Sequence, residues 1–420
     1  MDKNIHTIIL NCAQYEPLIH IQEVLLFKYT REIIRTFAKI GKTFNANNII
    51  IAAGKKDVEL IECLKDVLDD YPSLSLKIFD GAYPAGDEYV LTYELTGKVI
   101  PADSSPICEG IAIFNPESVY NMYMHVNKGV QDTHKWVSVL GEVKNPITLR
   151  VPVGVKAEAI VKMAGAITCE NPVYILGGPM SGKIGNKYSR IDKSTDAIII
   201  LPEDHQVVYN KKANSSIELK RAASSCCNCM RCTDLCPRHL LGHPVDPHAF
   251  IRAASYKDMN NLDTFLNTMF CSSCGLCEMY SCIQGISPRL LLTEYKNGLK
   301  ENGIVDFKAS VSEVDNERKY RKISIKRLTS RLGLTRYDRV TKFKEFNLSG
   351  EDIRISLNDN SKHPADILVK ENDSVTNGQL LAKYDKEDLL PIYSGVDGIV
   401  TEVTEGYILI ENQGGRTDNE

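Results

Sequence analysis

The sequence lacks any long stretch of apolar residues and any long run of basic residues. A membrane-spanning helix needs about 18 consecutive apolar residues, so no transmembrane segment is expected. The apolar run near the N-terminus is too short for a signal peptide, and no small-residue cleavage site follows it. With a formal net charge of −4, the chain has little to attract nucleic acid. We therefore expect a cytoplasmic protein without a nucleic-acid partner.

Cysteine, in contrast, is abundant: the chain has 13 in 420 residues. In a reducing compartment, clustered thiols indicate metal binding or redox chemistry and not disulfides. Nine of the 13 fall into two runs, which begin at Cys226 and Cys271. The other four are scattered, and we expect them to be ordinary buried thiols: Cys12, Cys63, Cys108 and Cys169.

The length and the 43% of hydrophobic residues allow two to four domains, each with its own core. Strand and helix patterns alternate at the N-terminus, which predicts a Rossmann-like α/β domain with a mostly parallel sheet. A β-rich segment with one helix follows, then short helices with the cysteines on the loops between them, and finally short strands separated by tight turns. The predicted domains are residues 1–130, 134–205, 215–300 and 343–412, with a charged linker at 301–342 in which "ISIKRLTSRLGL" could form a basic amphipathic helix.

The first cysteine run has the spacing Cys-x2-Cys-x2-Cys-x3-Cys-Pro that is typical of bacterial ferredoxins. In those proteins three close cysteines bind one [4Fe–4S] cluster and the fourth binds the neighbouring cluster. The second run has one more residue before its fourth cysteine, and Ile283 replaces the proline. Two such runs predict a dicluster module with exchanged fourth ligands. Cluster 1 would use Cys226, Cys229, Cys232 and Cys282, and cluster 2 would use Cys271, Cys274, Cys277 and Cys236.

Two zinc sites are the alternative, since zinc also binds four thiolates. Zinc does not explain the third and fourth cysteine of each run. Cys227 is a spare thiol in this interpretation. Nearby histidines could ligate haem or a single metal ion, but a loop that packs beneath a cluster explains them as well: His239, His243 and His248.

The segments "CNCMRCTDLCPRHLLGHPVDPH" and "CSSCGLCEMYSCIQGISPRLL" resemble the cobalamin reductases of propanediol-utilisation microcompartments (PduS-like proteins). They are similar, more distantly, to the C component of the Rnf electron-transport complex. The resemblance extends over nearly the whole chain. "VLGEVKNPITLRVPVG" resembles an SLBB β-grasp module, and the tail resembles a barrel-sandwich, lipoyl-like domain. The implied fold is multidomain α/β and β: a complex I flavoprotein-like domain, the SLBB module, an α-helical dicluster ferredoxin domain and the barrel-sandwich domain.

Three N-terminal segments, "TIILNCAQYEP", "YPAGDEYVLTYELTGKVIP" and "IFNPESVYN", resemble segments that line the FMN and NADH site of these families. The resemblance implies that carboxylates bind ribose or flavin groups and that Asn115 binds the isoalloxazine or ribityl portion. The implied site residues are Asn11, Glu16, Tyr83, Gly86, Asp87, Glu88, Asn115 and Glu117.

The Gly-rich segment that approaches the FMN phosphate in these families is missing from the sequence, and Gln14 replaces an acidic residue. The site could instead be degenerate, or it could be completed by another chain. "YPAGDE" would then be a polar turn, with Asp87 and Glu88 at the positive end of the following helix.

The resemblance implies an electron-transfer oxidoreductase that passes electrons from NADH or flavin through two [4Fe–4S] clusters to a corrinoid. An electron-wire or scaffold subunit of an Rnf-type or other flavoprotein complex, without its own flavin, is the second hypothesis, and a zinc-stabilised binding module is the third. The implied partner is a flavoprotein or a corrinoid enzyme such as an adenosyltransferase. The chain could also dock to a membrane complex or a microcompartment. The microcompartment lumen is then an alternative to the cytoplasm as the location of the protein. The tail has no lysine at its turn of residues 396–398, so docking or spacing is favoured over lipoylation.

Overall fold

The computed structural model describes residues 4–305, 308–309, 312–346, 350–357, 364–386 and 389–412. The chain forms two compact units, and each unit is built from three separate segments of the sequence. The first comprises Met1–Pro116, Pro179–Ser181 and Glu203–Arg339, and the second comprises Glu117–Gly178, Gly182–Pro202 and Val340–Glu420. Within the described part of the chain, no helix combines the length and apolar character that crossing a membrane requires.

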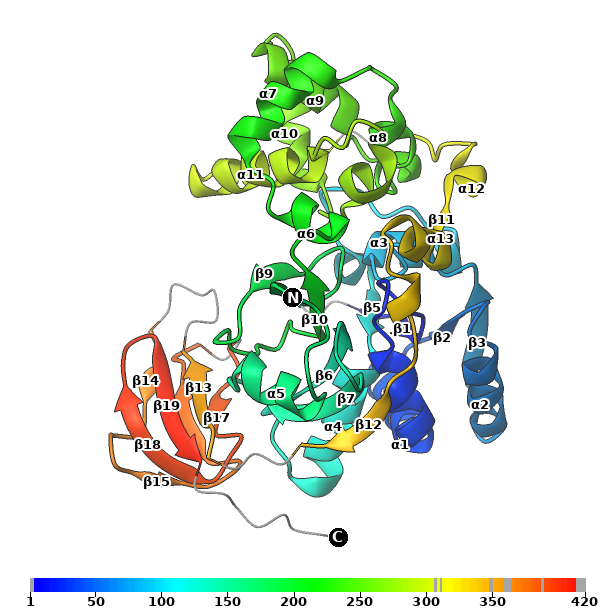
Figure 1. The fold of residues 1–420 in the computed structure, drawn as a ribbon. Coiled ribbons are helices and arrows are strands. Elements are labelled where there is room, and N and C mark those ends of the chain that lie inside the picture. The colour runs from blue at the N-terminus through cyan, green and yellow to red at the C-terminus, as the bar shows by residue number, and fades with distance from the viewer. Residues whose placement is uncertain are drawn as a thin grey trace. The chain divides into compact units, whose positions relative to one another are not determined.

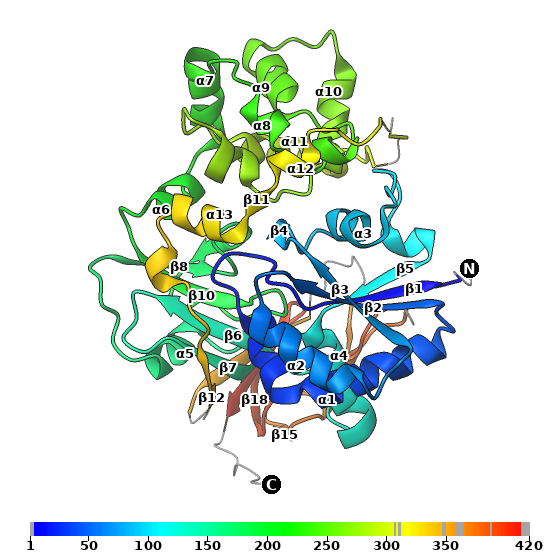
Figure 2. The ribbon, with the colours of Figure 1, turned by 90° about the vertical axis from the view of Figure 1, so that its right-hand side faces the viewer.

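A four-stranded parallel sheet is the centre of the first unit (Figure 1), with the strand order β3-β2-β1-β5. Its strands are β1 (Thr7–Asn11), β2 (Asn48–Gly54), β3 (Leu74–Phe79) and β5 (Ile111–Phe114). The sheet extends in one direction from β1 to β3, so right-handed connections place both intervening helices on the same face. Figure 2 shows α1 (Ile21–Thr43) and α2 (Val58–Leu68) together on that face. The predicted α/β arrangement is confirmed.

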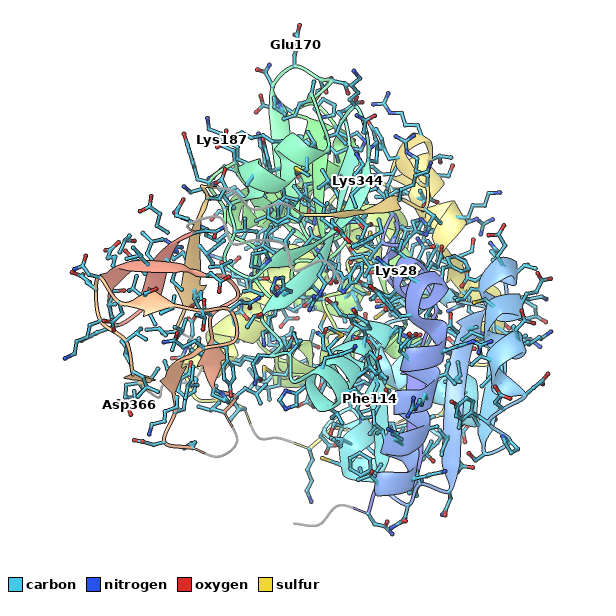
Figure 3. All side chains as sticks on the ribbon, turned by 90° about the horizontal axis from the view of Figure 1, so that it is seen from below. Lys28, Phe114, Glu170, Lys187, Lys344 and Asp366 are labelled. Carbon is cyan, nitrogen blue, oxygen red and sulfur yellow. The ribbon has the colours of Figure 1, made fainter. Side chains whose placement is uncertain are left out.

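Helix α1 buries one apolar face against the sheet because its apolar residues recur at helical spacing, as at Ile33 and Phe37. Gly41 allows the close approach, since a Cβ atom there would lie 2.4 Å from the Cδ1 of Ile49. Phe114 at the end of β5, labelled in Figure 3, meets the Phe37 ring edge-to-face at 6.2 Å.

Short helices flank the two cysteine runs, whose cysteines lie mostly on the loops between them, as the sequence predicts (Figure 1). They are α7 (Ser215–Ser225), α8 (Arg231–Asp234), α9 (Pro247–Tyr256), α10 (Leu262–Leu266) and α11 (Pro288–Glu301). Side-chain caps begin two of them: Asn214 accepts hydrogen bonds from the first turn of α7, and Asp246 accepts one from α9. A small core of Phe250, Phe265 and Tyr295 rings holds α9, α10 and α11 together.

Residues 301–342 are more than the charged linker that the sequence predicts. Strand β11 (Ile323–Ser324) pairs with β4 (Ala82–Tyr83), and α13 (Ile325–Arg331) follows it directly. Arg318 donates a hydrogen bond to Glu94 at 2.6 Å and stacks on the Tyr93 ring. Lys322 also pairs with Glu94, so the ion pairs of Arg318 and Lys322 fix this part of the segment within the first unit.

The second unit contains a six-stranded mixed sheet with the order β12-β7-β6-β10-β8-β9. Its strands are β6 (His134–Gly141), β7 (Ile147–Pro152), β8 (Pro172–Leu176), β9 (Lys183–Gly185), β10 (Ala197–Pro202) and β12 (Lys342–Glu345). Helix α4 (Pro116–Lys128) leads into this unit, and α5 (Ala157–Met163), the one helix expected in the β-rich segment, packs within it.

The tail folds into two small antiparallel sheets, β13-β19-β18-β15 and β14-β16-β17. Their strands are β13 (Asp352–Ser356), β14 (Asp366–Ile367), β15 (Ser374–Val375), β16 (Leu380–Lys383), β17 (Ile392–Tyr393), β18 (Gly398–Val403) and β19 (Tyr407–Asn412). Ile353 and Ile410 of these sheets share one apolar core with Val155 and Ile160. The tail is therefore packed on the six-stranded module, and Asp366 lies at its outer edge (Figure 3).

The scattered cysteines are less uniform than predicted. Cys12 is buried, and Cys63 and Cys169 are half-buried, but Cys108 is exposed. The prediction of a buried thiol is wrong for Cys108, because it lies in the 3-10 turn Pro106–Glu109, which buries only Pro106.

A half-buried group of ion pairs joins the tail to the six-stranded module. Both Lys156 and Arg190 donate hydrogen bonds to the Asp352 carboxylate. Burial alone would raise the pKa of Asp352, but these two cations outweigh it and lower the pKa to about 2. Since an unfolded aspartate titrates near 3.9, this group stabilises the fold above about pH 4, and the effect is lost as the pH falls toward 2.

We predict that Asp352→Asn lowers the free energy of unfolding of the second unit by about 2 kcal/mol at pH 7. Urea unfolding monitored by Trp136 fluorescence measures this, because Trp136 is the single tryptophan and is fully buried in this unit. Asp366→Asn is the matched control, since the Asp366–Lys383 pair is exposed and should change stability by less than about 0.5 kcal/mol. A gap between wild type and Asp352→Asn that stays the same from pH 7 to pH 3 would contradict the assignment.

Candidate metal centres

The two cysteine runs fold into loops of the same shape. In the first loop Asn228 and Met230 have positive φ angles of 54° and 59°, and in the second Ser273 and Gly275 have 55° and 80°. Each pair occupies the second and fourth positions after the first cysteine of its run. Left-handed residues in such turns direct successive backbone N–H groups into a concavity, which suits an anionic group. Both loops thus have a backbone that can enclose an iron–sulfur cluster.

Each loop lines a cavity together with one cysteine from the other run. The first cavity is lined by Cys226, Cys227, Cys229, Cys232 and Cys282. The second is lined by Cys236, Cys271, Cys274 and Cys277. Each cavity therefore has three cysteines of one CxxCxxC motif and the fourth cysteine of the other run, with Cys227 in addition at the first.

A π-helical turn absorbs the extra residue of the second run. The N–H of Cys282 donates to the carbonyl of Cys277, five residues earlier, at 3.2 Å. In the first run the N–H of Cys236 donates to Thr233, three residues earlier, at 2.9 Å. The wider turn thus takes up the additional residue before Cys282.

Burial and neighbouring thiols raise the pKa of at least one cysteine in each cavity, as Cys232 and Cys274 show. Burial first, then the neighbours Cys282, Cys226 and Cys229, raise the pKa of Cys232 to about 12. Burial and Cys271 raise the pKa of Cys274 to about 11. The thiolate is the form that binds metal, so iron would have to displace these protons. The positive charge of iron would then compensate the negative thiolate charge, which burial disfavours.

Donors are already directed at the sulfur atoms. The N–H of Ser273 lies 3.3 Å from the Sγ of Cys271, and the N–H of Ile286 lies 3.3 Å from the Sγ of Cys282. His248 lines the first cavity, and its buried Nε2 has no hydrogen-bond partner among the described residues. A cluster sulfide would give this buried nitrogen the hydrogen-bond partner that it lacks. The residues around the first cavity are therefore suited to an iron–sulfur cluster.

The other two histidines of this region bind backbone carbonyls. His239 contacts the carbonyl oxygen of Val245 at 3.0 Å, and His243 contacts that of Ile100 at 2.9 Å. These contacts agree with a packing role for both.

A single metal ion needs a different arrangement of ligands. Within the described residues, no group of three or more His, Cys, Asp or Glu side chains is arranged to hold one metal ion. A [4Fe–4S] cube does not require its four thiolates to converge on one point, because each binds a different iron atom at a corner.

The second cavity is attached to the α/β part of the first unit. The hydroxyl of Tyr83 donates a hydrogen bond to the carbonyl of Cys274 at 2.6 Å, and burial raises the pKa of this phenol so that it keeps its proton. Arg238 follows Cys236 by two residues, and its Nε donates to Asp87 at 3.0 Å. Its guanidinium also lies 3.7 Å from the centre of the Tyr89 ring.

The predicted flavin residues are mostly engaged with other protein groups. Asp87 accepts hydrogen bonds from the N–H groups of Tyr89 and Val90, which makes it the N-cap of α3 (Glu88–Thr96). Glu88 is exposed at the start of this helix, and partial desolvation, with the neighbouring Asp87, raises its pKa. The polar-turn interpretation therefore describes the local structure of Asp87.

Glu16 and Asn11 also bind within the first unit. Glu16 accepts hydrogen bonds from the N–H and hydroxyl of Ser181, both at 2.7 Å, and from the N–H of Met180. Asn11 donates to the carbonyl of Ala85 at 3.2 Å.

The remaining members of the predicted set are divided between the units. A Cβ atom at Gly86 would lie 2.8 Å from the Cβ of Tyr15, so the chain needs glycine there. Asn115 follows β5 in the first unit, whereas Glu117 belongs to the second unit, where it binds Lys135 and the N–H of Trp136. The structure thus assembles Asn11, Tyr83 and Gly86 near one another through the 83–88 turn.

A cavity of about 390 Å³ that the sequence interpretation did not identify lies at the carboxyl ends of β1, β2 and β3. Open parallel sheets bind ligands at this edge, and the volume is within the range of cofactor pockets. Its charged lining residues are Lys56, Lys326, Asp57, Asp80 and Asp338, and Gln14, which replaces an acidic residue, lines it as well. Burial first, and then Glu23, raise the pKa of Asp57 to about 6. The signal in the sequence was "AAGKKD", a strand that ends in glycine and charged residues.

Comparison with known families agrees with this arrangement. Residues 1–124 match the family model of the Nuo51 FMN-binding domain, and residues 225–287 match that of the 4Fe-4S dicluster domain. The chain is therefore an iron–sulfur electron-transfer protein that joins an FMN-binding-type α/β domain to a 4Fe-4S dicluster domain.

Three relatives place it more narrowly. Cobalamin reductase PduS of Citrobacter freundii is 30% identical over 412 residues, which cover 98% of this chain and 91% of the relative. Cobalamin reductase PduS of Salmonella typhimurium is 28% identical over the same shares. The C component of the Na(+)-translocating ferredoxin:NAD(+) oxidoreductase complex of Acetobacterium woodii is 23% identical over 57% of this chain and 52% of the relative. The chain belongs to the PduS cobalamin reductase family.

We predict that Arg238→Ala lowers the free energy of unfolding of the first unit by about 3 kcal/mol, because it leaves the buried Asp87 carboxylate without its cation. Arg238→Lys should retain part of this stability, since it keeps the charge but loses the planar stacking on Tyr89. Urea unfolding monitored by circular dichroism measures the difference. Arg231→Ala removes an exposed arginine of the same segment and should change stability little. An equal loss of unfolding free energy in Arg231→Ala and Arg238→Ala would contradict the prediction.

Proposed function

We propose that this chain transfers electrons from NADH, by way of a flavin, to two [4Fe–4S] clusters and then to an acceptor, a corrinoid. The observation that carries this proposal is the pair of cavities, each lined by three cysteines of one run and the fourth of the other. The names of the PduS relatives support the acceptor class. A bound [4Fe–4S] cluster supplies reversible one-electron storage.

The cysteine side chains divide into two ligand sets in this proposal. Cluster 1 is held by Cys226, Cys229, Cys232 and Cys282, with a hydrogen bond from Nε2 of His248. Cluster 2 is held by Cys236, Cys271, Cys274 and Cys277, with Tyr83 orienting the loop through the carbonyl of Cys274. Cys227 lines the first cavity as a spare thiol.

The chain gives the two sites different neighbours, and this supports an order of electron flow. The second cavity is tied to the α/β domain through Tyr83 and Arg238, and Cys277 is buried. The first cavity borders solvent, since Cys227 and Cys229 are exposed. Electrons from the α/β domain would therefore enter at the second site and leave from the first.

The cavity at the carboxyl ends of β1, β2 and β3 is the proposed flavin site. The match to the Nuo51 FMN-binding domain supports it, as does the location at this edge of the sheet. Lys56 provides positive charge for a phosphate, and the Gln14 amide provides hydrogen-bond groups for the ring or ribityl chain. FMN bound here would accept a hydride from NADH and release single electrons.

The finer domain identities are also proposals. The six-stranded sheet with α5 would be the SLBB β-grasp module, and the two small sheets of the tail would be a barrel-sandwich domain. The turn at residues 396–398 reads Val-Asp-Gly, so this domain would serve docking or spacing. The partner would be a flavoprotein or a corrinoid enzyme such as an adenosyltransferase, in the cytoplasm or a microcompartment lumen.

One observation favours the alternative of an electron-wire or scaffold subunit without its own flavin. Glu16 and Asp87, the acidic residues that the resemblance assigns to the flavin and NADH, are already bound to backbone N–H groups and Arg238.

Iron content tests the exchanged ligand sets. We predict about eight irons per chain and a loss of about four in Cys282→Ala. The double variant Cys226→Ala/Cys282→Ala should also retain about four, because both residues serve one cluster, whereas Cys271→Ala/Cys282→Ala should retain almost none. Cys227→Ala is the control and should keep all eight. If Cys226→Ala/Cys282→Ala instead retained almost no iron and Cys271→Ala/Cys282→Ala retained about four, each run would bind its own cluster.

Flavin binding separates the main proposal from the alternative. The fluorescence of FMN added to the anaerobic protein should be quenched on binding. NADH should then bleach the visible absorbance of the clusters, and the protein should reduce cob(III)alamin. Lys56→Ala should weaken FMN binding about tenfold through the lost charge-assisted contact, while the neighbouring Lys55→Ala should not. Eight irons without FMN binding or NADH bleaching would refute the flavin proposal and leave the electron-wire function.

A further inference from the structure

A second, larger cavity of the first unit lies beside the proposed cluster 1 site. It measures about 690 Å³, and its lining includes Arg231, Tyr280, Ile283, Lys326, Arg327 and Arg331. We call it the basic cavity. Ile283 lines both this cavity and the first cysteine cavity, and Arg231 stands between Cys229 and Cys232 in the chain. A molecule in the basic cavity would therefore lie against the wall of the cluster 1 site.

Positive charge in the basic cavity is not compensated. Four of its lining residues are arginine or lysine, all four are exposed, and no carboxylate lines it. In the described part of the chain, none of these four cations forms an ion pair. The chain as a whole has a net charge of −4, so this patch has the sign opposite to that of the molecule. Such a local field attracts an anionic partner and raises its rate of association.

The fold holds the charged groups in a fixed arrangement. Helix α13 buries Ile325, Leu328 and Thr329 and exposes Lys326, Arg327 and Arg331 on its other side. The helix follows β11, which pairs with β4 through Ile323 and Tyr83. The same Tyr83 binds the carbonyl of Cys274. The basic face is therefore anchored to the segment that orients the second cysteine loop.

Exposed apolar side chains accompany the cations. Met230 is 45% exposed and Ile283 is 52% exposed, and both line the first cysteine cavity. A small apolar centre with charges around it is suited to a transient protein complex, in which electrostatics sets the association rate and the buried area stays small. A site for a small phosphate compound would instead need enclosed donors, and the cations here all face solvent.

We propose that the basic cavity is the docking surface for a redox protein whose acceptor group is surrounded by carboxylates. This inference rests on the proposed assignment of cluster 1. In each encounter one electron leaves the reduced cluster and enters the partner's acceptor, with no bond formed or broken. NADH is the reductant in the proposed function, and dithionite replaces it in the test.

The experiment uses the full chain, reduced anaerobically with dithionite and mixed in a stopped-flow instrument with oxidised flavodoxin, an acidic redox protein. The test variant is Arg327→Glu/Arg331→Glu, which leaves Lys326 of the proposed flavin cavity unchanged. The matched control is Arg31→Glu/Arg35→Glu, which makes the same change of net charge on the exposed side of α1. We expect the second-order rate at low salt to fall at least tenfold in the test variant and less than twofold in the control. The Gln version of the test variant should give an intermediate rate, and high salt should remove the differences.

Two further oxidants separate the possible failures. Benzoquinone, which is uncharged, should oxidise the reduced clusters of all variants at the same rate; a chain without reducible clusters overturns both the proposed function and the docking surface. If the clusters are reducible but the test and control variants transfer electrons to flavodoxin at the same rate, the docking surface alone is overturned. Ferricyanide is a small anion, and a loss of its rate as large as that of flavodoxin would show attraction of small anions and overturn protein docking.

Discussion

The exchange of the fourth cysteines is the constraint on which the helical part of this protein depends. Cys236 lies with the second run and Cys282 with the first, so neither cavity is complete unless both loops are in place. Residues 237–270, which include α9 and α10, separate the two runs and must fold so that the loops meet. The aromatic core of Phe250, Phe265 and Tyr295 holds that spacing. A small apolar core and two sets of thiols therefore stabilise each other.

Much of the fold could be predicted from the sequence because its signals are local. Parallel strands such as "IILN" and "IIIAAG" are continuous apolar runs, and α1 shows a clear helical period. The grouping of the cysteines followed from their spacing alone, and the structure brings the same sets together. The shared loop shape could not be predicted as readily, because three of its four left-handed positions carry Asn, Met or Ser instead of glycine.

The candidate flavin residues show where resemblance and local sequence reach their limits. Asp87 caps a helix and also pairs with Arg238, a residue more than 140 positions away. Glu16 binds the backbone at Met180 and Ser181, which no periodicity in the sequence links to it. The charged segment before residue 342 was interpreted as a linker because its partners, Glu94 and β4, are distant in the chain. Long-range pairing, and not local propensity, determines these features.

Strand β12 has a consequence for how the protein is made. The six-stranded sheet gains its edge strand at Lys342–Glu345, although its preceding strand, β10, ends at Pro202. A ribosome that adds 5–20 residues per second would take roughly ten seconds to synthesise the intervening segment. During that interval β7 has an unpaired edge, which is a site of aggregation in nascent chains. The cysteine loops emerge from the ribosome within the same interval, so cofactor insertion and closure of this sheet edge fall into one window of biosynthesis.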